Sequence, residues 1–213
     1  MPKVEESGRS LLSKGLLRKA QEMATKNVGI LQEWVSEEAP LVGVEPSAIL
    51  SFRDEYLDLL QGAIQKQAQK IAQHTFTIEE FLAQELDKGH IRAEQFSQES
   101  KLIKLHGHCH QKALSSLTPS KKILSLPQNY EVHLIPSGCC GMAGSFGYEK
   151  EHYALSMQIG ELVLFPNVRK QASDVLIVAV GTSCRHQIKD GTKREALHPV
   201  EVLWEAAEII KNE

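Results

Sequence analysis

Two adjacent cysteines lie in a glycine-rich segment of this chain, residues 137–144 (SGCCGMAG). The chain has four cysteines in its 213 residues, and all four lie in the C-terminal half, at Cys109, Cys139, Cys140 and Cys184. That number matches one four-thiolate site, so the question is which group the thiols bind. In a reducing compartment, cysteines serve as metal ligands or redox groups before they serve as disulfides. The alternative is four unrelated, buried, small hydrophobic side chains.

The spacing of the cysteines favours a cluster over a zinc finger. No two of them are separated as C-x₂-C, the pattern of zinc ribbons and fingers. Adjacent residues do not easily present both thiolates to one tetrahedral ion, whereas they can serve two metals of a cluster. Four thiolates suit an iron–sulfur cluster.

Glycines surround the cysteine pair at every third position, and Gly138, Gly141 and Gly144 are the candidate cofactor-binding members. Glycine allows positive φ and a close approach of the backbone to a bulky inorganic group. Neighbouring N–H groups can then donate to sulfur atoms. The spacing is not the nucleotide-binding G-x-G-x-x-G. The alternative interpretation is a flexible turn of small residues.

Histidines alternate around the first cysteine, at His106, His108 and His110. If this segment is extended, His108 points away from the other two. A histidine here can ligate a metal, donate to a cluster sulfur or relay a proton, and an ordinary hydrogen-bonding role is the alternative for each. We take His108 and His110, which flank Cys109, as candidate cofactor-binding residues. His186 follows Cys184 by two positions and has the same options.

Helical patterns dominate the first half of the chain. Apolar residues have helical spacing over residues 12–35, and a short buried strand is expected at residues 39–44. Further helices are expected from Pro46, over residues 62–73, and after a capping box that begins at Thr77.

Strands alternate with helices in the second half. The expected elements are strands at residues 101–105, 130–135 and 174–180, a helix over residues 148–162, and a last helix opened by Pro199 with Val200, Leu203, Trp204 and Ala207 facing inward. This alternation predicts an α/β fold whose parallel sheet is covered on both faces. Each cysteine segment follows one of the strands, and the carboxyl ends of parallel strands meet at one edge. Three distant loops are therefore expected to converge.

A weak internal repeat relates the two halves. Gly8, followed by two helices and a strand that ends before Ala48, parallels Gly141, two helices and a strand that ends before Cys184. On this alignment residues 6–7 take the place of Cys139 and Cys140. The first copy is then a truncated lobe without metal ligands. The alternative is that any two βα units look alike.

Composition excludes several classes of function. Lys and Arg number 24 against 27 Asp and Glu, a net charge of −3, so no nucleic-acid surface is expected. The sequence shows no apolar run near the roughly 18 residues of a membrane helix, and no apolar signal region at its start. We therefore expect a cytoplasmic protein without a transmembrane segment, peripheral to a membrane only through partners.

Four segments together resemble the cysteine-rich CCG domain family, which includes the iron–sulfur subunit of glycolate oxidase and the B subunit of heterodisulfide reductase. The segments are HCHQKA at residues 108–113, CCGMAGSFGYE at 139–149, GTSCRHQI at 181–188 and HPVE at 198–201. The likeness is in particular to the C-terminal region of fused FAD-linked oxidoreductases of the D-lactate and 2-hydroxyglutarate dehydrogenase type. It extends over nearly the whole chain.

The resemblance implies two pseudo-symmetric α/β lobes. Residues 1–90 would form a degenerate, truncated, helix-rich half-repeat with a helical linker, and residues 91–213 the metal-binding CCG domain. It also implies electron transfer within a flavin-dependent 2-hydroxyacid oxidoreductase, with FAD on a partner flavoprotein domain or subunit and a ferredoxin-type subunit as a further partner. The chain is then a component of an FAD-linked enzyme rather than a catalyst by itself.

Carried over by position, the resemblance makes Cys109, Cys139, Cys140 and Cys184 the metal ligands. The family motif ends in C-x-x-C, and Gln187 stands here in place of its last cysteine. A four-cysteine cubane cluster is therefore expected rather than a five-cysteine one. Two alternatives are a zinc-binding structural or sensory module, for example on Cys109, Cys184 and a histidine, and a metal-free thiol redox protein using Cys139 and Cys140.

Overall fold

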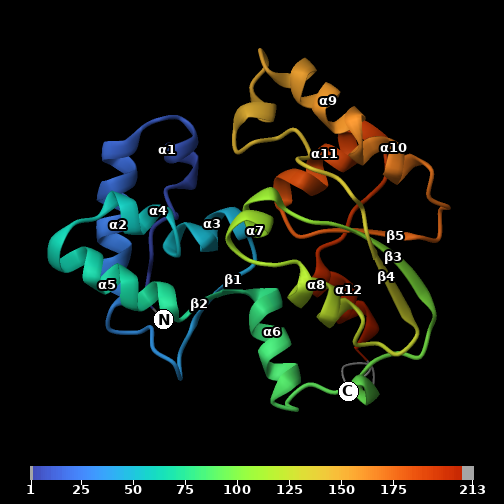
Figure 1. Ribbon diagram of the computed structural model, residues 1–213, viewed down its shortest axis with the longest axis horizontal. Helices are drawn as coiled ribbons and strands as arrows, with labels where there is room; N and C mark the ends of the chain where they lie inside the picture. Colours follow the sequence, from blue (N-terminus) through green and yellow to red (C-terminus); the bar gives the residue numbers. More distant parts are fainter. Residues whose placement is uncertain (1, 208–213) are drawn as a thin grey trace. The chain divides into compact units, whose positions relative to one another are not determined.

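A computed structural model describes residues 2–207 of the chain (Figure 1). The chain divides into two compact units, Met1–Ile78 and Glu79–Glu213. In the described part, no helix combines the length and the apolar character that crossing a membrane requires.

The first unit is a set of short helices around a two-stranded parallel sheet. Strands β1 (Leu41–Gly43) and β2 (Thr75–Thr77) pair in parallel, with Val42 opposite Phe76. The helical segments of this unit are α1 (Arg9–Ser13), α2 (Leu17–Leu31), α3 (Pro46–Ile49), η1 (Leu50–Phe52), α4 (Glu55–Leu59) and α5 (Gly62–Gln73).

The second unit is built on a three-stranded parallel sheet with the order β4-β3-β5. Its strands are β3 (Lys101–His106), β4 (Tyr130–Leu134) and β5 (Leu176–Ala179). The helical segments are α6 (Ile78–Asp87), η2 (Ala93–Gln95), α7 (Cys109–Leu114), α8 (Thr118–Leu124), η3 (Phe146–Tyr148), α9 (Tyr153–Leu162), α10 (Leu164–Arg169), α11 (Thr182–Thr192) and α12 (Pro199–Ala206).

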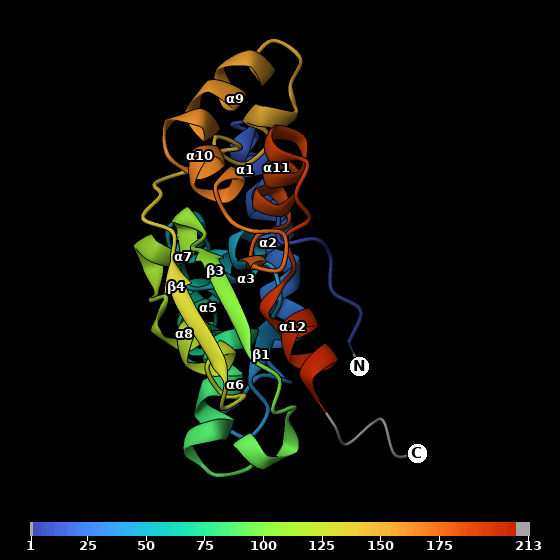
Figure 2. The same ribbon diagram turned by 90° about the vertical axis from the view of Figure 1, so that its right-hand side faces the viewer.

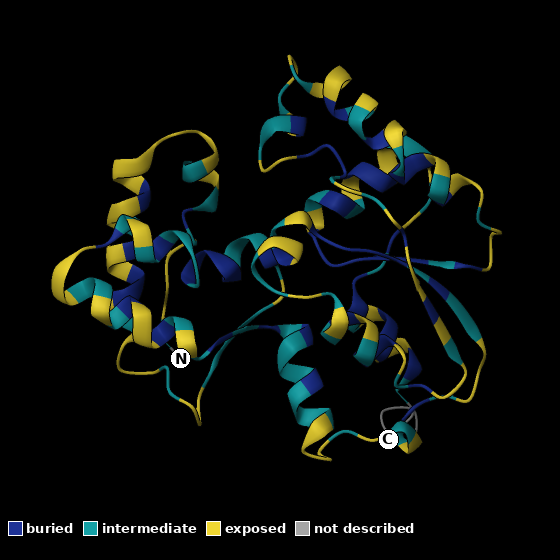
Figure 3. Cartoon of the chain, viewed as in Figure 1, coloured by how far each residue is buried: buried dark blue, intermediate teal, exposed yellow. Residues whose placement is uncertain are grey.

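Both faces of this sheet are covered. One face packs Ile177 and Ala179 against Phe165 of α10 and Ile188 of α11, and the other packs Ile103, Leu105 and Val178 against Leu124 of α8 and Val202 of α12. Figures 1 and 2 show α9, α10 and α11 grouped together, and Figure 3 shows buried residues on the inward sides of the helices. Period-2 alternation along the strands produces this division, because successive side chains point to opposite faces.

The expected α/β architecture, with short parallel sheets flanked by helices, is confirmed. Some elements differ in detail. The helix expected from Pro46 is broken into α3, η1 and α4, and the helix expected over residues 148–162 begins only at Tyr153. The sequence analysis did not assign β2, α7, α8, α10 or α11.

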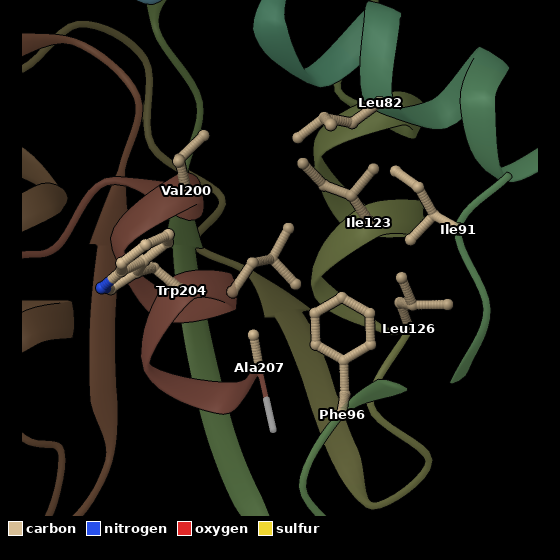
Figure 4. Close-up of a pocket in the computed structure, with 9 residues that line it drawn as sticks. Leu82, Ile91, Phe96, Ile123, Leu126, Val200, Trp204 and Ala207 are labelled. Carbon is tan, nitrogen blue, oxygen red and sulfur yellow. The ribbon is translucent and has the colours of Figure 1, made fainter. Parts of the chain in front are cut away.

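The expectation that Trp204 faces inward is wrong. Its side chain is 65% exposed, whereas Val202, Leu203 and Ala206 of the same helix are buried. Trp204 lies at the edge of an apolar pocket that Leu82 and Ile123 also line (Figure 4). The helix meets the sheet through the row of Val202 and Ala206, so residue 204 falls on the outward side.

Candidate metal centre

Cys109 is placed by the end of strand β3. The strand stops at His106, and Cys109 is the first residue of helix α7. His108 caps this helix, because its Nδ1 accepts the backbone N–H of His110 at 3.2 Å. Cys109 is exposed, at the N-terminus of this helix.

The Cys139–Cys140 turn follows strand β4 and has an unusual backbone. Gly141 has φ +103° and Gly144 has φ +70°, while Ala143, which is not a glycine, is held at φ +41°. A Cβ on Gly141 would lie 2.2 Å from the carbonyl oxygen of Ser156, so this position admits only glycine. The Gly141 N–H donates to Cys139 Sγ at 3.3 Å, an example of a backbone donor aimed at sulfur.

Two further contacts fix the turn at its ends. Lys112 Nζ donates to the carbonyl oxygens of Ser137 and Gly138, at 2.9 and 2.8 Å. The hydroxyl of Ser156 in α9 donates to the Gly141 carbonyl at 2.9 Å. The turn is therefore held to α7 at its start and to α9 beyond the cysteine pair.

Cys184 is the third residue of α11, the helix that follows strand β5. It is buried, in the first turn of the helix. Gly181 precedes the helix, and a Cβ there would lie 2.4 Å from Cδ2 of His108 and 3.3 Å from Cys184 Sγ. His108 and Cys184 thus approach each other because residue 181 has no side chain.

The four thiols act on one another, which places them in one group. Hydrogen bonds from the thiols of Cys109 and Cys140 lower the pKa of Cys139, and the contact with Cys140, then that with His106, lowers the pKa of Cys184. The same bonds, together with burial, raise the pKa of Cys109 and of Cys140. The thiols of Cys109 and Cys140 therefore act as donors toward the sulfurs of Cys139 and Cys184.

The other predicted residues lie around this group in different ways. His108 is buried, and it lies beside Gly181 as the sulfur of Cys184 does. His110 is half-buried, with its ring centroid 6.5 Å from that of His108, and its backbone N–H lowers the pKa of Cys109. Gly138 and Gly144 are exposed, and a Cβ on Gly138 would meet nothing within 4 Å. The sequence analysis expected His108 to point away from His106 and His110 if this segment is extended. The strand ends at His106, so the segment is not an extended strand.

Gln187, which stands in place of the last family cysteine, binds Ser156 of α9. It is buried, and its Nε2 donates to the carbonyl and hydroxyl oxygens of Ser156 at 3.1 and 2.9 Å. Since Ser156 in turn bonds the Gly141 carbonyl, the glutamine braces the cysteine turn. Its amide is therefore turned to α9.

The sequence analysis named His106 among the histidines that can ligate a metal, but it did not select this residue as a candidate site residue. A ring nitrogen of His106 and the Sγ atoms of Cys140 and Cys184 all lie within 4.8 Å of one another. Strand alternation was a signal for this position. His106 lies four residues after Leu102 in the same strand, so the two side chains are on the same face of the sheet. Leu102 packs on the face that also carries Cys140 and Cys184.

Comparison with known proteins found relatives among dehydrogenases. The chain is 28% identical over 205 residues to the D-2-hydroxyglutarate dehydrogenase of Haemophilus influenzae, a match that covers 93% of the chain and 19% of that protein. It is 26% identical over 200 residues to the C subunit of the anaerobic glycerol-3-phosphate dehydrogenase of Escherichia coli, and this match covers 93% of the chain and 48% of its relative. The D-2-hydroxyglutarate dehydrogenase of Pseudomonas putida is 27% identical over 205 residues, and this match covers 95% of the chain and 19% of that protein.

The chain thus spans about a fifth of the length of the first of these relatives and about half of the second. No protein-family model and no solved structure matches the chain.

Proposed function

We propose that this chain is the electron-transfer module of a flavin-dependent 2-hydroxyacid oxidoreductase, and that it holds a 4Fe-4S cluster. Cys109, Cys139, Cys140 and Cys184 are the proposed ligands. The observation that carries the proposal is a series of thiol contacts that joins all four cysteines, from Cys109 to Cys139, from Cys139 to Cys140 and from Cys140 to Cys184. The cysteines come from three segments, and each segment follows the carboxyl end of one strand of the parallel sheet.

The donor set fits such a group. Thiolates are the usual ligands of iron–sulfur clusters, and a backbone N–H already points at the sulfur of Cys139. The left-handed backbone at Gly141 and Gly144 keeps side chains out of the turn. When bound, a cluster supplies one-electron chemistry. Lys112, fastened to the start of the turn, adds positive charge beside the anionic thiolates.

Exposure of the thiols suggests which side exchanges electrons. Cys140 and Cys184 are buried, Cys139 is half-buried and Cys109 is exposed. A partner therefore has its shortest approach to the centre at Cys109, at the start of α7. The buried pair, enclosed by α10 and α11 side chains, excludes water from the opposite side.

The partner in this proposal is a flavoprotein. Two relatives are named as dehydrogenases of 2-hydroxyglutarate, and the chain matches only about a fifth of the first of them. The FAD site and the substrate site are proposed to lie on another domain or subunit, with a ferredoxin-type subunit as a further electron carrier. Membership of the CCG family and the half-repeat nature of residues 1–90 are parts of the same proposal.

A zinc site is the second candidate, and one observation favours it. The Sγ atoms of Cys140 and Cys184 lie within 4.8 Å of each other, a separation that a single ion can span. In that case the chain would be a structural or sensory module of the same fold.

Anaerobic analysis separates the two candidates. The chain, purified and reconstituted with ferrous iron and sulfide without oxygen, is expected to be brown, to contain about four irons and four sulfides per chain, and to give a paramagnetic signal after reduction. A colourless protein that retains zinc and no sulfide after this treatment would contradict the cluster and favour the zinc site.

A further inference from the structure

His106 is the last residue of β3 and is almost fully buried, at 1% exposure. It pairs in register with Ala179 of β5, next to the loop that leads to Cys184. Its ring lies on the sheet face that carries the two buried cysteines rather than on the face covered by α8 and α12. A polar ring in such a position needs partners for both nitrogens.

One nitrogen has a hydrogen-bond partner that allows the tautomer with a free lone pair on the other. His106 Nδ1 lies 2.7 Å from Ser137 Oγ, and the Ser137 hydroxyl can donate to the Ile135 carbonyl at 3.5 Å. With that donation made, the serine oxygen accepts the N–H of Nδ1. The Nε2 atom is then the unprotonated nitrogen, with its lone pair available.

The other nitrogen faces sulfur. Nε2 is buried and makes no hydrogen bond of ordinary geometry within the described residues, while its ring is close enough to lower the pKa of Cys184. With Nδ1 engaged by Ser137, Nε2 is the atom left to join the Sγ atoms of Cys140 and Cys184 within 4.8 Å. Around one tetrahedral ion, bonds of about 2.0 Å to nitrogen and 2.3 Å to sulfur put donor atoms roughly 3.5–3.8 Å apart.

We propose that His106 Nε2 is a direct nitrogen ligand of the metal centre, together with Cys140 and Cys184. The inference deepens the proposed function, on which it rests: a cubane has one terminal position on each of its four irons, and the nitrogen of His106 would take one of them in place of a thiolate. Gln187 does not compete for this role, because its amide is bonded to Ser156. Ser137 is the positioning residue, which holds the ring and its tautomer as outer partners of metal-bound histidines do.

Nitrogen ligation has its own spectroscopic signature, so the test does not depend on activity. The chain is produced with ¹⁵N-labelled or ordinary histidine, reconstituted with iron and sulfide, reduced, and studied by pulsed electron paramagnetic resonance. We expect a strongly coupled ¹⁴N signal that changes to a ¹⁵N signal with the label. In His106→Ala the coupling is lost, whereas the control His133→Ala, which removes an exposed imidazole of β4, keeps it.

A zinc-loaded sample of the full chain tests the same residue without a cluster. X-ray absorption is expected to show one imidazole at about 2.0 Å beside sulfurs at about 2.3 Å. Ser137→Ala is expected to weaken zinc binding by about 10-fold while leaving the imidazole in place.

The outcomes separate the two proposals. A wild-type cluster without directly coupled histidine nitrogen, or with a coupling that persists in His106→Ala, overturns the inference and leaves the proposed function standing. A wild-type protein that takes up no iron and sulfide overturns the proposed function. In that case the zinc-loaded protein decides about His106. Zinc bound by sulfur alone would overturn its role as a ligand, whereas an imidazole that X-ray absorption shows in the wild type and not in His106→Ala would support it. If His106→Ala does not fold, the absence of any coupled histidine nitrogen in the labelled wild type still overturns the inference, and a coupled nitrogen there supports histidine ligation.

Discussion

The two units of the chain use similar local structure, with thiols in only one of them. In the first, β1 leads into α3, and Ala48 is the third residue of that helix; in the second, β5 leads into α11, and Cys184 is the third residue. The parallel partners also correspond. Strand β2, which follows α5 and precedes α6, pairs with β1, and Leu197, which follows α11 and precedes α12, bridges in parallel to Val178 of β5.

The glycine turns differ in how tightly they are packed. Gly8 and Gly141 both have positive φ, at +76° and +103°. A Cβ on Gly8 would meet Ala20 at an ordinary 3.6 Å, whereas one on Gly141 would lie 2.2 Å from the Ser156 carbonyl oxygen. The shared positive φ fits a repeat whose first copy keeps the backbone conformation without thiols. The tight packing is found only at Gly141, the glycine that follows the cysteine pair.

The largest expected effect is on metal content. Cys140→Ser is expected to remove nearly all bound iron and sulfide, because it deletes the buried thiol that contacts both Cys139 and Cys184. The matched variant Ala48→Ser, at the corresponding helix position of Cys184 in the first unit, is expected to leave metal content unchanged. Iron and sulfide analysis of both variants checks this. Wild-type iron in Cys140→Ser would refute the ligand assignment, and a loss in Ala48→Ser would show that the first unit takes part.

The second prediction compares the glycine turns. Gly141→Ala is expected to destabilise its unit by about 2–4 kcal/mol, from backbone strain plus a clash with backbone. Gly8→Ala is expected to cost only about 1 kcal/mol, from strain alone. Gly138→Ala, which meets open space, is expected to change stability by less than about 0.5 kcal/mol.

Each unit carries its own fluorescent reporter for this series. The chain has two tryptophans, Trp34 and Trp204, which are 54% and 65% exposed. Denaturant unfolding is followed through Trp34 in a Trp204→Phe background for Gly8→Ala, and through Trp204 in a Trp34→Phe background for the other two. Equal losses at Gly8 and Gly141 would contradict the packing difference between the turns.

The third prediction concerns the brace of the cysteine turn. Gln187→Ala is expected to destabilise the second unit by about 1–3 kcal/mol, because it leaves buried oxygens of Ser156 with fewer donors. The matched change in the first unit, Gln65→Ala, removes a bond from a half-buried amide to the Leu57 carbonyl, and it is expected to cost less than about 1 kcal/mol. The same single-tryptophan unfolding measurements apply. Equal losses of stability in the two variants would contradict the role of Gln187 in holding the cysteine turn.

The sheet that gathers the thiols could be predicted from sequence, and part of its surroundings could not. Strands β3, β4 and β5 are short, rich in branched residues and followed by cysteine segments, so local pattern and parallel topology together predict their convergence. Strand β2 is three residues long and has two threonines, and only its pairing with β1 makes it a strand.

Other misses have equally specific causes. Helix α10 contains Pro166, which argues against a helix, yet the proline lies in the first turn, where no intrahelical N–H is needed. His106 was passed over because the alternating histidines directed attention to the residues beside Cys109, whereas its role follows from which sheet face the end of β3 presents. The sheet face on which such a side chain lies depends on tertiary packing, which cannot be derived from one sequence.

The fourth prediction concerns Tyr56, a buried residue of the first unit. Its hydroxyl donates to the Ser7 carbonyl and accepts from Asn27, and burial raises its pKa to about 12. Because the folded pKa lies above the unfolded value of about 10, the contribution of this tyrosine to stability is complete below pH 10 and is lost as the pH rises toward 12.

Ultraviolet titration of phenolate absorbance checks this. One of the four tyrosines is expected to ionise near pH 12, and the step should vanish in Tyr56→Phe but persist in Tyr148→Phe, which changes an exposed ring. Tyr56→Phe is expected to cost about 1 kcal/mol at pH 7, since it frees the Ser7 carbonyl beside Gly8. If that step remains in Tyr56→Phe, another tyrosine titrates near pH 12, and the burial of the Tyr56 hydroxyl between Asn27 and Ser7 does not produce the raised pKa.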